Sequence, residues 1–220
     1  MAFVDLISSL HNATKRNYLL RVTEHDKAEC AEVAKRFDKE YFDGDRRHGY
    51  GGFRYDGRWK AFGEKLIGQY GLKPGDSVLD IGCAKGFLVK DLLGLLPGSD
   101  IRGVDVSAYA IAHAEPEVRD HVQVADAVRL PFADKSFDLV VSINTLHNLR
   151  VPGLFQALRE MERVGKKHKY LVVDSYRNER EKVNLLYWQV TCECFFTPEE
   201  WEFLFRQAGY TGDYDCVFFP

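Results

Sequence analysis

The chain has 220 residues, 45% of them hydrophobic, and a formal net charge of −3 at pH 7. This length predicts one domain, with or without an extension, and a core of substantial size. The small negative charge gives no general attraction for nucleic acid, and no apolar run is long enough to cross a bilayer. The first ten residues have an Asp inside their only apolar run and no basic region before it, unlike a signal peptide. We therefore expect a cytoplasmic protein that binds neither nucleic acid nor membranes.

The cysteines predict reduced thiols. Their number is odd and their spacing lacks the density of a disulfide framework. Cys192 and Cys194 flank a single residue, whereas zinc sites use Cys-x2-Cys pairs or histidine partners at suitable spacing. We therefore expect no metal site.

The first part of the chain is predicted to be helical. Apolar residues recur at helical spacing over 3–41, and good helix formers are dense in this stretch. The pattern breaks over 43–57 and resumes over 58–72. We therefore divide the chain into a helical N-terminal extension that acts as a lid, residues 1–60, and a main domain, residues 61–220.

After Pro74, short apolar runs alternate with segments of helical spacing, which predicts a parallel sheet covered by helices on both faces. The predicted strands are residues 77–83, 101–106, 121–126, 137–144 and 170–175. A further helix over 177–190, a well-capped helix over 197–210 and one last strand complete the chain, while the basic run 165–170 is expected to be solvated surface. The pattern leaves open whether residues 192–196 or a partner supply a seventh strand. Such sheets bind ligands at the carboxyl ends of their strands.

A glycine-containing turn follows the first of these strands. Asp80 ends the strand, and Gly82 and Gly86 flank the turn into the next helix, where missing Cβ atoms let a ligand approach the backbone. The spacing differs from the G-x-G-x-x-G of a dinucleotide fold, and no G-K-[ST] closes a phosphate loop. Nicotinamide binding is therefore disfavoured, although it stays open as an alternative.

The turn resembles motif I, [DE]-x-G-x-G-x-G, of the class I S-adenosylmethionine (SAM)-dependent methyltransferases. Ala84 stands in place of the middle glycine, a change that suits the loop if Ala84 keeps a negative φ. Further likeness lies in an acid ending the second strand, Asp105, and in Asp126-Ala127 followed by Leu-Pro-Phe and Ser-Phe-Asp. The resemblance extends over 78–149, and more loosely to Gly209. It implies a three-layer α/β sandwich with a mostly parallel, Rossmann-like sheet of six to seven strands.

The resemblance also implies SAM as the cofactor. Asp105 is then expected to accept hydrogen bonds from both ribose hydroxyls, Val106 to flank the adenine, and Asp126 to accept from the adenine amino group. In the N-terminal lid, Arg58 is expected to hold the methionine carboxylate. The full predicted cofactor set is Asp80, Gly82, Cys83, Ala84, Gly86, Asp105, Val106, Asp126, Ala127, Asn144 and Arg58.

The residues that follow the fourth strand indicate which kind of atom accepts the methyl group. Residues 142–147 lack the [ND]-P-P-[YF] motif of nucleobase and glutamine amine methylation, which favours O- over N-methylation. His147 and Asp174 follow the fourth and fifth strands and are the predicted catalytic bases, with a capping or packing role as the alternative for His147. His113 and His121 lie away from this edge and are expected to be structural.

The stretch 45–60 holds five basic residues against two acids and is rich in Gly and aromatic residues. It suits a lid over an anionic ligand, with Tyr50, Arg54 and the more distant Tyr176 as substrate-binding residues, or else a solvated loop packed on the N-terminal helices. We therefore expect a methyltransferase that acts on a small polar, anionic metabolite. The alternatives are a nicotinamide-dependent oxidoreductase and a non-catalytic module of the same fold, and the sequence does not set the oligomeric state.

Overall fold

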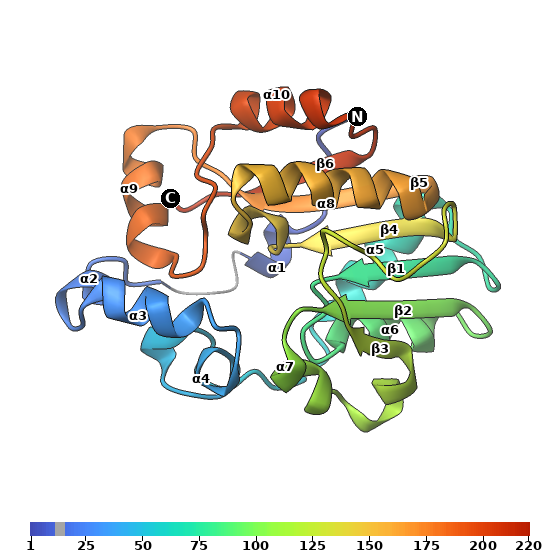
Figure 1. Cartoon of the computed structure of the whole chain (residues 1–220), viewed down its shortest axis with the longest axis horizontal. Coiled ribbons are helices and arrows are strands. Elements are labelled where there is room, and N and C mark those ends of the chain that lie inside the picture. Colours follow the sequence, from blue (N-terminus) through green and yellow to red (C-terminus); the bar gives the residue numbers. More distant parts are fainter. Residues whose placement is uncertain (12–15) are drawn as a thin grey trace.

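A computed structural model describes residues 1–11 and 16–220 (Figure 1). The described residues build a six-stranded sheet of order β3-β2-β1-β4-β5-β6, in which all neighbours are parallel. This confirms the predicted Rossmann-like α/β fold. The strands are β1 Ser77–Ile81, β2 Asp100–Asp105, β3 Val122–Val124, β4 Phe137–Ile143, β5 Gly165–Asp174 and β6 Asp213–Val217.

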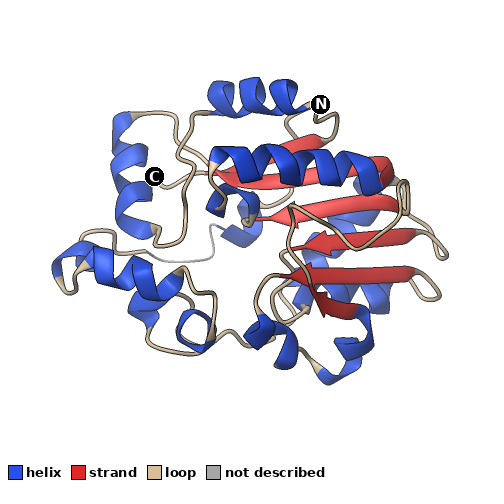
Figure 2. Cartoon of the chain, viewed as in Figure 1, coloured by secondary structure: helices blue, strands red, loops and turns tan. Residues whose placement is uncertain are grey.

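Helices cover both faces of the sheet, as Figure 2 shows. Successive residues of β1 point to opposite faces, so Val78 joins a core with α5 and α6 while Leu79 joins a second core with α8 and α10. The main helices are α5 Trp59–Tyr70, α6 Phe87–Leu95, α7 Ala108–Ala112, α8 Val151–Val164, α9 Glu179–Trp188 and α10 Pro198–Ala208, with short 3-10 turns η2 Pro116–His121 and η3 Leu146–Asn148. No helix of the described residues is long and apolar enough to cross a membrane.

The N-terminal extension is helical as predicted, but it is broken into short pieces. They are α1 Ser8–His11, α2 Leu20–Thr23, α3 Lys27–Ala34, α4 Lys39–Phe42 and the 3-10 turn η1 Arg46–His48. The Asp26 carboxylate accepts hydrogen bonds from the first turn of α3, and Asp38 does the same for α4. Between these two helices Phe37 has a φ of 50°, which ends the first helix and turns the chain.

The first residues of the chain lie on the open edge of the sheet beside β6. Phe3 forms a parallel bridge with Tyr214, and the Asp215 carboxylate accepts hydrogen bonds from the backbone N–H groups of Leu6 and Ile7. The segment 192–196, considered as a seventh strand, instead contributes one bridge from Phe196 to Ser175. This edge position separates residues 2–7 from the part of the extension that lies near the ligand end of the sheet.

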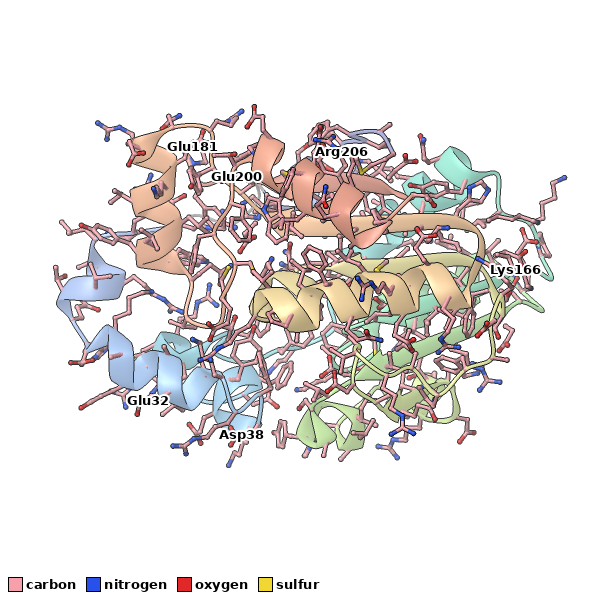
Figure 3. The ribbon with its side chains drawn as sticks, turned by 45° about the horizontal axis from the view of Figure 1, so that its top comes forward. Glu32, Asp38, Lys166, Glu181, Glu200 and Arg206 are labelled. Atoms are coloured by element: carbon pink, nitrogen blue, oxygen red, sulfur yellow. The ribbon has the colours of Figure 1, made fainter. Side chains whose placement is uncertain are left out.

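The basic run 165–170 is only partly the solvated surface that its composition predicts, because Lys166 and Lys167 are exposed but Lys169 is buried. β5 begins at Gly165, and Lys169 is only 6% exposed, with its Nζ 2.9 Å from the Glu162 carboxylate. Because β5 packs against α8, Lys169 is buried together with Glu162, the acid that pairs with its charge. Figure 3 shows Lys166 at the amino end of β5, far from Glu32 and Asp38 in the N-terminal helices.

Candidate cofactor and substrate site

A cavity of about 230 Å³ opens at the carboxyl ends of β1, β2 and β4. Its floor consists of Ile81, Val104 and Ile143, the last or nearly last residues of those strands. Parallel strands bring their carboxyl ends to one edge of the sheet, so residues distant in sequence meet here. The predicted cofactor residues that line the cavity are Gly82, Ala84, Asp105, Val106, Asp126, Ala127 and Asn144.

The turn after β1 is fixed by close packing. Gly82 has a φ of 83°, and a Cβ there would lie 2.0 Å from the Thr145 Oγ1 in the loop after β4. Gly86 has a φ of 77°, and its Cβ would lie 2.8 Å from a methyl of Val118. Both positions therefore require glycine.

Ala84 departs from the expected backbone conformation. Its φ is 50°, in the left-handed region, so the condition under which alanine suits this loop, a negative φ, is not met. An alanine in this region carries strain of about 1 kcal/mol or more. In this conformation the Ala84 N–H donates a hydrogen bond to the Asp105 Oδ2, 2.8 Å away. This hydrogen bond connects the turn to the end of β2.

Asp105 retains acceptor capacity for a ligand. Its Oδ2 accepts from Ala84 and its Oδ1 accepts from the Ser107 N–H at 2.8 Å, which leaves a second lone pair on each oxygen. Burial raises the pKa of this carboxyl, and the two backbone hydrogen bonds oppose the rise. Val106 beside it is 57% exposed, an apolar surface suited to a flat ring.

Three other predicted cofactor residues lie beneath or beside the cavity lining. Asp80 is 4% exposed, and burial, followed by the charge of Asp105, raises its pKa to about 7. Cys83 is buried, and its sulfur lies against Gly103 of β2, where a Cβ would come within 2.8 Å. Gly86 caps the start of α6. These residues shape the turn after β1, which also holds the cavity-lining residues Gly82 and Ala84.

Residues 37–53, here called the cover segment, form the other wall of the cavity. Phe37, Tyr41, Phe42 and Tyr50 line it. Their rings contact one another, with the Phe42 and Tyr50 rings stacked at a centroid distance of 6.1 Å. An aromatic wall of this kind excludes water from the carboxyl ends of the strands.

A partly buried ion pair links the cover segment to the glycine turn. Lys85 Nζ lies 2.7 Å from the Asp43 carboxylate and donates to the Phe53 carbonyl at 2.9 Å, and the Tyr109 hydroxyl donates to Asp43 at 2.8 Å. Burial opposes ionisation of Asp43, but the hydrogen bonds from Lys85 and Tyr109 outweigh it and lower its pKa. The Phe53 ring also stacks on Phe87 at 4.6 Å. Sequence reasoning missed this connection, because the only signal was a lysine inside an otherwise small-residue turn.

The structure does not bring Arg58, Arg54 or Tyr176 to the cavity lining. The Arg58 side chain is 55% exposed and its Nη2 lies 2.6 Å from the Asp56 carboxylate. Arg54 is exposed, whereas Tyr176 is buried after β5 and its ring packs below the Lys182 amine. Of the three predicted substrate-binding residues, Tyr50, Arg54 and Tyr176, only Tyr50 lines the cavity.

The two predicted bases form a buried pair behind the cavity wall. His147 and Asp174 are each 1% exposed, and the His147 Nε2 lies 3.6 Å from the Asp174 Oδ2. The Asp174 backbone N–H donates to the His147 Nδ1 at 3.0 Å, so Nδ1 holds the lone pair and the ring proton is on Nε2. Burial lowers the pKa of His147, against the effect of Asp174. In this arrangement His147 has no free basic nitrogen.

Cys192 joins this pair, and one ligand atom from each residue lies within 4.8 Å of the others. A histidine that binds a metal normally donates its second ring N–H to an acceptor. Here the second nitrogen of His147 accepts a hydrogen bond instead, so Nε2 keeps its proton. The geometry therefore suits a polar packing cluster better than a metal centre.

Comparison with known proteins identifies the domain. Residues 79–173 match the family described as "Methyltransferase domain". The chain is 29% identical over 125 residues to the sterol 24-C-methyltransferase ERG6B of Gibberella zeae, which covers 52% of this chain and 33% of that enzyme. It is 31% identical over 110 residues to the 27-O-demethylrifamycin SV methyltransferase of Amycolatopsis mediterranei, covering 46% of this chain and 39% of that enzyme. The chain thus matches well under two thirds of the length of either relative.

The fold also recurs in solved structures. A SAM-dependent methyltransferase from Aquifex aeolicus superposes with a TM-score of 0.52 at 19% identity, covering 84% of this chain and 88% of that one. At this identity the likeness establishes the fold alone. The named acceptors of the two sequence relatives differ, one a sterol carbon and the other a rifamycin oxygen, so the shared region does not fix an acceptor.

Proposed function

We propose that the chain is a class I SAM-dependent methyltransferase and that it transfers a methyl group from SAM to a small polar, anionic metabolite. The observation that carries this proposal is the cavity at the carboxyl ends of the strands, which gathers seven predicted cofactor residues under an aromatic cover. Residues 1–60 then serve as the extension that supplies the cover segment, and residues 61–220 form the catalytic domain.

The lining residues suit the parts of SAM. The free lone pairs of Asp105 fit a pair of ribose hydroxyls, and the exposed surface of Val106 fits the adenine face. Asp126 and Ala127 lie on the same side for the adenine edge, and Asn144 and Gly82 border the turn. When bound, SAM supplies a methyl group activated by a sulfonium.

The cover segment would align the acceptor and keep water away. Methyl transfer is an in-line displacement, so the acceptor oxygen forms a bond to carbon as the sulfur–carbon bond breaks, and S-adenosylhomocysteine leaves. The cavity volume of about 230 Å³ lies below the roughly 300–1,000 Å³ of small-molecule sites, so we expect the cover segment to shift outward when ligands enter. We expect the Asp43–Lys85 pair to stay in place as the anchor about which the rest of the segment moves.

Oxygen is the proposed acceptor atom because the loop after β4 lacks the amine-methylation motif. The carboxylate of an acid needs no base, whereas a hydroxyl must lose its proton. For a hydroxyl acceptor we propose His147 or Asp174 as the base. His147 can take this role only if the hydrogen bond to its Nδ1 opens, and a pH-rate profile of His147→Ala tests it.

The test of the cofactor is calorimetry with SAM on the whole chain. We expect Asp105→Ala to lower SAM affinity at least tenfold, since charge-assisted hydrogen bonds contribute about 1.5–3 kcal/mol each. Asp100→Asn changes an exposed acid at the other end of β2 and is the matched control. Unchanged binding by Asp105→Ala contradicts the ribose assignment.

A screen of phosphorylated sugars, sugar nucleotides and small acids tests the transfer, with S-adenosylhomocysteine as the readout. Turnover of one of these acids or phosphates supports the proposal. A rise in melting temperature with NADH but not with SAM favours an oxidoreductase. SAM binding without turnover of any acceptor favours a non-catalytic module.

A further inference from the structure

Three guanidinium groups converge on one indole at the side of the molecule where the N-terminal helices approach α9. The Cζ atoms of Arg16, Arg21 and Arg46 lie 5.4, 5.1 and 5.5 Å from the centroid of the Trp188 ring. Trp188 ends α9, and α2 packs against this helix (Figure 1). We call these four residues the arginine cluster.

The cluster concentrates positive charge. Burial lowers the pKa of Arg21, and the charge of Arg46 lowers it further, against a smaller opposite effect of Asp45. Burial also lowers the pKa of Arg16, where Arg46 adds to the decrease and the charges of Tyr18 and Asp174 oppose it. The charges of three neighbouring guanidinium groups therefore repel one another in a partly desolvated place, which favours an anion among them.

The described contacts of Arg21 and Arg46 are to neutral acceptors. Arg21 donates to the carbonyls of Trp188 and Arg46 at 3.3 and 2.6 Å. Arg46 donates to the carbonyls of Gly49 and Tyr50, both at 2.9 Å. Within residues 1–11 and 16–220, no carboxylate lies within ion-pair distance of Arg21 or Arg46. Contact with an aromatic ring contributes only about 0.5–2 kcal/mol to each cation, so an anionic partner is still favoured.

The arginine cluster borders the cofactor cavity. Tyr50, whose carbonyl accepts from Arg46, also lines that cavity. Tyr50 therefore links the cofactor cavity to the cluster. Arg46 is exposed, which leaves the cluster open to a ligand from solvent.

We propose that the arginine cluster binds the carboxylate or phosphate group of the methyl acceptor, while the body of the acceptor lies along Tyr50 toward the cofactor cavity. Guanidinium groups match both anions through paired N–H donors, and Trp188 supplies an apolar wall. This inference rests on the proposed methyltransferase function for its identification of the ligand as the acceptor. It names Arg16, Arg21 and Trp188, which sequence reasoning missed because they lie far from the motif residues.

The test is a titration of inorganic phosphate, and separately of malonate, into the whole chain at constant ionic strength, followed by tryptophan fluorescence. We expect saturable binding of at least one anion, with phosphate tighter if the acceptor carries a phosphoryl group and malonate tighter if it carries a carboxylate. Trp188→Phe should remove the signal. Absence of saturation by both anions overturns the proposal.

The charge variants make the test specific. We expect Arg21→Gln and Arg46→Gln each to weaken anion binding about tenfold, because each removes one charge-assisted contact. Arg36→Gln, an exposed arginine at the end of α3, is the control and should bind as the parent does. Circular dichroism checks that each variant folds. If Arg21→Gln fails to fold, the variant at the exposed Arg46 tests the proposal by itself. Equal anion binding in parent and Arg46→Gln contradicts the proposal.

SAM calorimetry on the parent chain separates the two proposals. If the parent binds the anions but not SAM, the proposed function fails and the anion site remains. If it binds SAM but neither anion, the cofactor assignment stands and the arginine cluster has no anion role.

Discussion

Replacement of Asp80 by Asn should remove the loss of stability that ionisation of this buried acid causes as the pH rises toward 7. Asp80 is 4% exposed, and burial with the charge of Asp105 raises its pKa from 3.8 to about 7. The folded chain therefore holds this proton more tightly than the unfolded chain. The resulting stabilisation is complete below about pH 4 and is lost as the pH rises toward about 7.

The size of the effect follows from the difference in pKa. The rise from 3.8 to about 7 corresponds to about 4 kcal/mol. The advantage of Asp80→Asn over the parent should thus grow by up to about 1.4 kcal/mol per pH unit between pH 4 and 7, and level off above. Asparagine has nearly the shape of the acid and stays neutral throughout.

Urea unfolding at pH steps from 5 to 8 measures this difference, with Asp120→Asn as the control for loss of an exposed carboxyl. Parallel stability curves for the parent and Asp80→Asn would refute the reasoning. The same linkage acts on binding, because a cationic ligand such as SAM favours the ionised carboxyl. SAM affinity should therefore rise from pH 6 to 8 in the parent and change less in Asp80→Asn, which calorimetry can follow.

Other predictions concern the cover and the turn. Asp43→Asn should lower SAM affinity about tenfold and speed proteolysis of the cover segment, and the swap Asp43→Lys with Lys85→Asp should recover part of the loss. Equal proteolysis of parent and Asp43→Asn would argue against the tie. Gly82→Ala should lower the free energy of unfolding by about 2 kcal/mol or more in urea titrations, since its Cβ meets Thr145; a neutral effect contradicts the packing. His147→Ala should leave the pH-rate profile of methyl transfer unchanged in shape if the histidine only packs, whereas loss of the fall in rate at low pH supports a role as base.

The amino-acid sequence by itself determined the parallel sheet, the glycine turn and the acids at the ends of its strands. These features are local: alternating strands and helices fix the sheet, and Asp105 and Asp126 follow their strands directly. The cap of α10 is equally local, because Thr197 and Glu200 satisfy each other's backbone N–H groups. The backbone conformation of Ala84 could not be predicted from the turn sequence alone, because its positive φ goes with a hydrogen bond to another strand.

Only the tertiary structure decided how the site is covered and charged. The tie from Asp43 to Lys85, and the meeting of Arg21 with Trp188, join residues 42 and 167 positions apart. No periodic pattern encodes such contacts, because they depend on how separately formed elements pack. The state of His147 has the same origin, since the backbone N–H that fixes its ring proton belongs to the neighbouring strand.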